Sequence, residues 1–192
     1  MSNWVNLRQI EPKAYDCGYC GAYVASNQGY QGIRGNRYVY IYICPNCQLP
    51  TYIDELDHKV PGTPYGNPVE HISSDEVQIL YDEVRRCMSI NAYTAAVLCC
   101  RKLLMNIAVS KGASEGLRFI QYVEFLSNQG FIPPDAREWV DHIRQKGNEA
   151  THEIAIMSRF DAEELVNFVE MLLKLIYEFP SRIKSRQVNN IS

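Results

Sequence analysis

The chain has 192 residues, of which 46% are apolar, and its formal net charge at pH 7 is -3. This length and composition predict one ordinary domain with its own core plus a small module, and they exclude a chain that is disordered throughout. The charge excludes a global basic field of the kind that drives non-specific binding to duplex DNA, so any nucleic-acid contact must be local.

Targeting signals and the pattern of cysteines indicate the cellular compartment of the protein. No charged-then-apolar leader opens the sequence, and the longest uncharged apolar run, residues 95–100, is too short to span a bilayer. The seven cysteines include two tight pairs, a pattern that fits metal binding in a reducing compartment better than a disulfide framework. We therefore expect a cytoplasmic protein that does not contact a membrane.

Residues 1–60 are expected to form a small β zinc ribbon. They contain two Cys-x-x-Cys knuckles, Cys17 with Cys20 and Cys44 with Cys47, separated by 23 residues. Together the knuckles supply the closed tetrahedral thiolate set of a structural zinc site, with one ion per chain. Because so small a module buries little apolar surface, its folding is expected to depend on the metal. A redox role is disfavoured, since a redox Cys-x-x-Cys normally stands alone at a helix start.

Between the knuckles, residues 37–43 alternate strictly and predict a strand, with which residues 49–54 are expected to pair. Residues 27–35, which contain three glycines, are expected to form the loop at the far end of the ribbon. One face of the predicted strand carries three tyrosines: Tyr38, Tyr40 and Tyr42.

Two interpretations of this tyrosine face stay open. The rings could stack unpaired bases, with Arg34 and Arg37 contacting the nucleic acid beside them. Alternatively, the rings could cover the face of a thin sheet or dock it on the next domain.

The rest of the chain predicts a mainly helical domain over residues 73–182, after a linker rich in proline and glycine at residues 61–72. A basic tail, residues 183–192, is either a frayed solvated end or a contact for phosphate or a partner. Apolar residues recur at helical spacing in five segments, which predict helices at residues 73–89, 91–110, 114–129, 134–152 and 161–179.

Three residues of these helices carry specific expectations. Asp161 is expected to cap the last helix, and Pro180 to end or kink it. Arg101 lies inside the apolar run of the second helix, where an unpaired charge is very unfavourable. It is therefore expected to reach a carboxylate, a backbone carbonyl or water.

The candidate catalytic residues end the fourth predicted helix. If this helix continues, Arg144, Asn148 and His152 recur every fourth residue and share one face. A guanidinium binds phosphate oxygens and an imidazole transfers protons near neutral pH, so the three residues suit phosphate chemistry. Two other interpretations stay open. Gly147 and Asn148 could end the helix before His152, or the three could be capping and packing groups.

Several of these segments together resemble the bacterial domain of unknown function 4145, a family placed in the HEPN superfamily of all-helical bundles. The resemblance covers roughly residues 75–180. It is carried by residues 95–104, by residues 116–126 and, most specifically, by the pattern Ile-Arg-x-x-Gly-Asn-x-x-x-His at residues 143–152. An N-terminal zinc ribbon is a familiar attachment in this family. The resemblance thus implies a HEPN-like helical bundle preceded by the ribbon.

The resemblance also implies a dimer and, as in many members of the superfamily, a metal-independent ribonuclease or toxin of phage defence and stress response. The catalytic motif of the superfamily, an Arg followed four to six residues later by a His, falls on Arg144 and His152, with Asn148 as the polar companion. Seven residues separate Arg144 from His152 here. Lys146 has the usual distance to His152 but is not an arginine.

Three functions therefore remain as hypotheses. The first is an endoribonuclease of a defence or toxin system that leaves 2′,3′-cyclic phosphate ends. The second is a catalytically inactive adaptor that binds nucleic acid or protein in a defence or restriction system. The third is a purely structural or assembly role.

Overall fold

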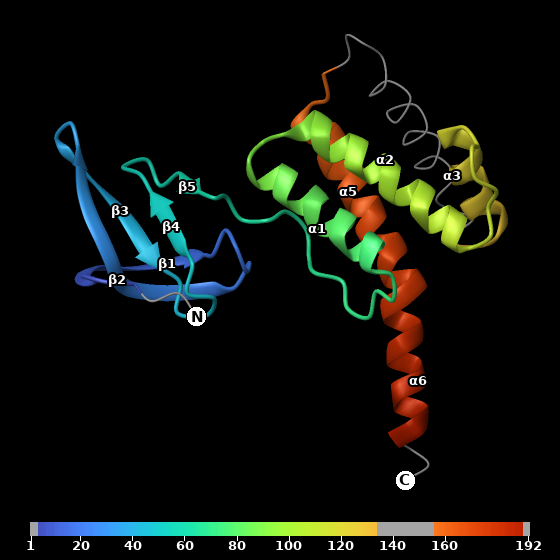
Figure 1. The fold of residues 1–192 in the computed structure, drawn as a ribbon, viewed down its shortest axis with the longest axis horizontal. Helices are drawn as coiled ribbons and strands as arrows, with labels where there is room; N and C mark the ends of the chain where they lie inside the picture. The colour runs from blue at the N-terminus through green and yellow to red at the C-terminus, as the bar shows by residue number, and fades with distance from the viewer. Residues whose placement is uncertain (1–3, 134–155, 190–192) are drawn as a thin grey trace. The chain divides into compact units, whose positions relative to one another are not determined.

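The computed structural model describes residues 4–133 and 156–189 of the chain. Two compact units divide it, Met1–Tyr65 and Gly66–Ser192. The first contains all the described strands and is called the sheet unit, and the second contains the described helices and is called the helical unit (Figure 1). Each unit is described by itself.

The sheet unit is one antiparallel sheet in the strand order β1-β2-β3-β4-β5. The strand predicted over residues 37–43 is confirmed as β3, and its pairing with the following segment is confirmed because Tyr42 lies opposite Thr51. The five strands are β1 (Arg8–Asp16), β2 (Tyr23–Arg34), β3 (Arg37–Ile43), β4 (Pro50–Ile53) and β5 (Lys59–Val60).

The prediction of a loop over residues 27–35 is wrong. Strand β2 runs through most of these residues, and only Gly35 and Asn36 form the turn to β3. Gly35 has a φ of +62°, which explains a glycine at the turn. Gly29 has a different role, because a Cβ there would lie 1.9 Å from the carbonyl oxygen of Ile41 on β3. This glycine marks a close approach of two backbones within a sheet.

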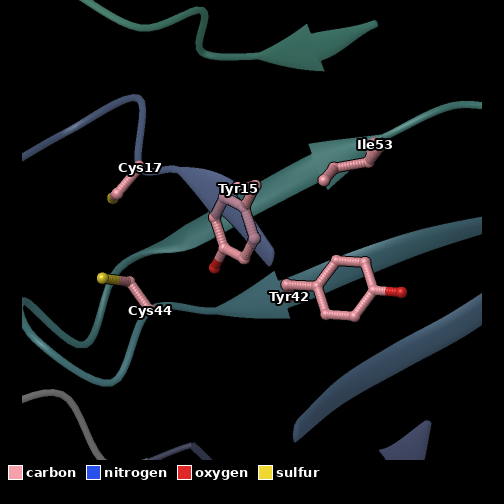
Figure 2. Packing of buried hydrophobic residues seen from close by; sticks show 5 residues of the cluster. All are labelled: Tyr15, Cys17, Tyr42, Cys44 and Ile53. Atoms are coloured by element: carbon pink, nitrogen blue, oxygen red, sulfur yellow. The ribbon is translucent and has the colours of Figure 1, made fainter. Parts of the chain in front are cut away.

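A small core holds the sheet unit together on the tyrosine side of β3. The ring of Tyr15 lies between two cysteines on one side and Tyr42 and Ile53 on the other (Figure 2). The ring centroids of Tyr15 and Tyr42 are 5.7 Å apart. The cluster consists of Tyr15, Cys17, Tyr42, Cys44 and Ile53, all at most 4% exposed. Two of the four knuckle cysteines are therefore part of the core itself.

The helical unit is organised around α2, which contacts α1, α3 and α5 (Figure 1). Among the described residues, α2 is the one helix long and apolar enough to cross a membrane, and its contacts with three helices account for this composition in a folded core. The helical segments are α1 (Asp75–Ser89), α2 (Tyr93–Ser110), α3 (Phe119–Asn128), α5 (Arg159–Leu173), the π-helix η2 (Lys174–Glu178) and α6 (Phe179–Asn189).

Two helices begin elsewhere than predicted. Helix α3 starts at Phe119 rather than at Ser114, because Gly116 has a φ of +77° and interrupts the helical path. Helix α5 starts earlier than predicted, because Ser158 is its N-cap. Asp161 has the reciprocal role, since its carboxylate accepts the N–H of Ser158 at 3.0 Å in a capping box.

Pro180 does not end the last helix. The chain leaves α5 through η2 and continues as α6, which contains this proline. The N–H of Phe179 donates to the carbonyl of Lys174, five residues back. Proline has no N–H, and its ring clashes with the carbonyl four residues back in an α-helix. The wider π-helical turn just before Pro180 therefore lets the helix continue.

Two buried carboxylates hold the start of the helical unit against its last helices. Glu170 on α5 accepts the backbone N–H of Asn67 at 2.8 Å and the Asn67 side-chain amide at 2.9 Å. Glu178 on η2 accepts the backbone N–H of Glu70 at 3.1 Å. Asn67 and Glu70, which belong to the segment predicted as a linker over residues 61–72, thus form hydrogen bonds within the helical unit.

Candidate metal centre

The four knuckle cysteines come together at one end of the sheet unit. The sulfurs of Cys17, Cys20, Cys44 and Cys47 all lie within 4.8 Å of one another. The Sγ atoms of Cys17 and Cys47 are 3.7 Å apart, and those of Cys20 and Cys44 are 3.9 Å apart. A tetrahedral ion with metal–sulfur bonds of about 2.3 Å sets its sulfurs about 3.8 Å apart. The cluster therefore has the size of a four-thiolate metal site.

The backbone builds this cluster from two equivalent turns. In each turn the N–H of the first cysteine donates to the carbonyl five residues on, and the N–H four residues on donates to the carbonyl of that cysteine. Gly21 and Gln48 occupy the same place in the two turns and have φ values of +70° and +64°. These bonds, of 2.9 to 3.0 Å, join Cys17 to Ala22 and Gly21, and Cys44 to Leu49 and Gln48.

The protonation of the cysteines differs within the cluster. Burial and the neighbouring cysteines raise the pKa of Cys47 to about 12. Burial also acts to raise the pKa of Cys20, but hydrogen bonds, above all from the Asn46 amide at 3.5 Å, lower this pKa to about 7. A bound metal cation favours the thiolate form of every ligand. Four thiolates around one ion leave no coordination position for water or substrate, so such a centre stabilises the fold.

The tyrosine face of β3 lines an open hollow of about 610 Å³ in the same unit. Tyr38 is 58% exposed, whereas Tyr42 is 1% exposed and donates its hydroxyl to the carbonyl of Glu11 at 2.9 Å. Ring centroids are 6.5 Å apart between Tyr38 and Tyr40, and 5.6 Å apart between Tyr40 and Tyr42. Only the outer two tyrosines can offer a ring to a ligand, because Tyr42 belongs to the core.

The sequence predicted basic residues beside the tyrosines, but the lining of this hollow is mainly acidic. Arg34 and Arg37 are paired across the β2–β3 turn and exposed, but only Arg37 lines the hollow. Acidic side chains outnumber basic ones in the lining, with Glu11, Asp54, Glu55 and Asp57 against Lys13 and Arg37. Sequence reasoning missed these acids, and no local motif marks them because they come from separate segments.

In the helical unit, Arg101 lies over an aromatic ring. Its guanidinium carbon is 4.2 Å from the ring centroid of Phe119. Nη1 is buried, and within the described residues it has no hydrogen-bond partner. Burial lowers the pKa of Arg101 from its ordinary value. A cation–π contact of this kind offsets part of the unfavourable burial of the charge.

The candidate catalytic residues lie outside the described part of the chain. This holds for Arg144, Asn148 and His152, for Lys146 as a candidate nucleic-acid contact, and for the helix predicted over residues 134–152. They are therefore predictions from the sequence alone.

Comparison with known proteins gives one match. Residues 82–190 match the family model described as "Domain of unknown function (DUF4145)", which is more than half of the chain. The matched residues lie within the helical unit, so the cysteine cluster and the tyrosine hollow are outside the match. No curated protein and no solved structure matches the chain.

Proposed function

The chain belongs to the DUF4145 family. We propose that it is a two-part adaptor, in which a zinc ribbon recognises a protein partner and the family domain performs a separate function. The observation that carries this proposal is the four-cysteine cluster in a unit outside the family match. A closed thiolate centre stabilises a fold without taking part in chemistry. The added unit therefore contributes a binding surface rather than a reaction.

Zinc is the metal that we assign to the cluster. Tetrahedral four-sulfur sites in proteins hold zinc or iron, and zinc is the usual ion where two Cys-x-x-Cys knuckles form a structural site. The proposal includes one zinc ion per chain, bound by Cys17, Cys20, Cys44 and Cys47, in a cytoplasmic protein.

Photo-crosslinking in the native cells tests the adaptor function. A photoreactive phenylalanine replaces Tyr38 in one variant and Tyr23 in a control, since both tyrosines are exposed on strands of the sheet unit. We expect a specific protein adduct from position 38 that position 23 does not give. Identical adducts at both positions, or none at position 38, would contradict the proposal, whereas RNA adducts would assign the surface to nucleic acid.

The second candidate function is an endoribonuclease of a bacterial defence or toxin system. The observation that favours it is the Arg144-to-His152 stretch, which lies within the family match and resembles the catalytic motif of the HEPN superfamily. His152 would transfer a proton, Arg144 would stabilise the charge on the phosphoryl oxygens, and Asn148 would orient the phosphate. A two-fold dimer would supply a second histidine for the other proton transfer.

RNA cleavage by the full chain tests this second candidate. If the domain is an enzyme, His152→Ala is expected to lower the cleavage rate by roughly two to four powers of ten, because a positioned proton-transfer group contributes about that much. The products should end in a 2′,3′-cyclic phosphate, and a short treatment with EDTA should not stop the reaction. Equal cleavage of an RNA with methylated 2′-hydroxyls would exclude the mechanism.

A further inference from the structure

The hollow beside the tyrosines is bounded by strands that are not neighbours in the sheet. Residues 11–13 of β1 line it together with Arg37 and the three tyrosines of β3, although β2 lies between these strands in the sheet order. The sheet must therefore curl around the hollow. Lys13 on β1 forms an ion pair of 2.7 Å with Asp57, beyond the end of β4. This ion pair joins two sides of the curl, so the hollow is formed before a ligand binds.

Two of the four acids around the hollow already have partners within the protein. Asp57 pairs with Lys13. Asp54 holds the turn after β4, because its Oδ1 accepts the N–H of Leu56 at 2.9 Å and the N–H of His58 at 2.8 Å. These acids hold the structure of the hollow together.

The other two acids, Glu11 and Glu55, have no ion-pair partner among the described residues. One oxygen of Glu55, Oε2, is buried and has no hydrogen-bond partner in the part of the chain that the structure describes. A buried carboxylate oxygen without a donor is unfavourable, and native proteins rarely leave one. A rotation of the Glu55 side chain toward the hollow would let this oxygen accept a hydrogen bond from a ligand.

The aromatic side chains in the lining also favour a positively charged ligand. The rings of Tyr38 and Tyr40 lie beside these acids in the wall of the hollow. Aromatic faces attract ammonium and guanidinium groups, and the attraction grows as water is excluded. At the rim, Tyr38 and Leu56 are 58% and 62% exposed. This apolar rim can contact the aliphatic stem of a long side chain and the residues next to it, which a small free cation lacks.

We propose that this hollow binds an extended segment of a partner protein and takes up one lysine or arginine side chain between the outer tyrosines and the carboxylates of Glu11 and Glu55. The inference rests on the proposed adaptor function and names the chemistry of the partner. A nucleic-acid ligand fits less well, because its phosphates would face a lining with four acids and two basic residues.

The test is an NMR titration of the zinc-loaded, nitrogen-15-labelled full chain. The probes are short synthetic peptides of valine and serine that differ at one central position, which is Lys, Arg, Gln or Glu. Arginine amide and a single-stranded oligouridine complete the set. We expect the Lys and Arg peptides to shift the amide signals of Tyr38, Tyr40 and residues 54–57, and to bind at least about tenfold more tightly than the Gln peptide. Added salt should weaken this binding.

Charge-neutral variants locate the binding site. The double variant Glu11→Gln with Glu55→Gln is expected to weaken binding of the Arg peptide by about tenfold or more, because it removes the charge of the two carboxylates that have no ion-pair partner among the described residues. Glu115→Gln is the matched control, since Glu115 is an exposed acid of the helical unit, and it should leave the affinity unchanged. An unchanged zinc content and unchanged amide signals away from the hollow show that the variants are folded.

Several results would overturn the inference. One is equal affinity for the Gln, Glu and Arg peptides, another is binding of oligouridine to the same amides, and a third is arginine amide binding as tightly as the Arg peptide. The proposed adaptor function is tested separately by crosslinking. A protein adduct at position 38 without selectivity for basic peptides would support the adaptor function and reject only the cationic segment as its ligand. If neither a protein adduct nor selectivity for basic peptides is found, both the adaptor function and the cationic ligand are rejected.

Discussion

Removal of the metal is expected to unfold the sheet unit and to leave the helical unit folded. The sheet unit has a small core in which two of the proposed metal ligands, Cys17 and Cys44, are themselves buried. Structural zinc sites of this kind contribute about 10 kcal/mol or more to folding, which exceeds the roughly 3–5 kcal/mol that the core of so small a domain supplies. The two units have separate cores, so loss of one does not remove the core of the other.

Two measurements check this prediction. Elemental analysis of protein purified without chelator should find one zinc ion per chain, and Cys44→Ser should lose it. In amide NMR spectra, both Cys44→Ser and a chelator in excess should collapse the dispersed signals of the sheet unit while those of the helical unit persist. Cys87→Ser is the matched control, because Cys87 is a cysteine of α1 outside the cluster. A sheet unit that keeps its dispersed signals without metal would show that the prediction is wrong.

The four-cysteine cluster could be predicted because its signal in the sequence is local. Each knuckle is a short turn whose sequence fixes two sulfurs, so that only the meeting of the two turns had to be inferred. The alternation over residues 37–43 identified β3 for the same reason. The acids of the hollow could not be found in this way. Glu11 and Glu55 are far apart in sequence, and only the curl of the sheet brings their segments together.

Glycines and caps explain most errors in the predicted elements. Gly29 is required by a close approach between strands, and from sequence it cannot be distinguished from a loop glycine. Ser158 and Asp161 are partners in one capping box, so the sequence shows the helix start but not which residue is the N-cap. The helix passes Pro180 because a π-helical turn precedes it, and neither helical spacing nor capping residues indicate such a turn in the sequence.

The second large effect is expected at Glu170, where Glu170→Ala should destabilise the helical unit by about 3 kcal/mol. This carboxylate is only 9% exposed. It accepts two hydrogen bonds from Asn67 and pairs with Lys174 one turn later. Alanine would leave the backbone N–H and the side-chain amide of Asn67 without this acceptor and would remove the ion-pair partner of Lys174. Urea unfolding of the zinc-loaded chain, followed by far-UV circular dichroism, measures the loss, since this signal comes mainly from helices.

Glu163→Ala on the same helix is the matched control. Glu163 also pairs with a basic residue one turn away, Arg159 at 2.6 Å, but the Arg159 side chain is 70% exposed. Exposed pairs of this kind contribute about 0.5 kcal/mol. Equal losses for Glu163→Ala and Glu170→Ala would contradict the role of the buried carboxylate, because both glutamates form an ion pair with a basic residue one turn away but only Glu170 is buried.

The pH dependence of stability gives a second, independent readout for Glu170. Burial acts to raise the pKa of Glu170, but hydrogen bonds from Lys174 and Asn67 outweigh it and lower this pKa. A carboxylate with a lowered pKa in the folded state contributes stability above its unfolded pKa, about 4.3, and loses this contribution as the pH falls towards the folded value. The difference in unfolding free energy between the wild type and Glu170→Gln should therefore be largest near neutral pH and shrink below about pH 4. A difference that stays constant across this range would show that the Glu170 charge does not stabilise the fold.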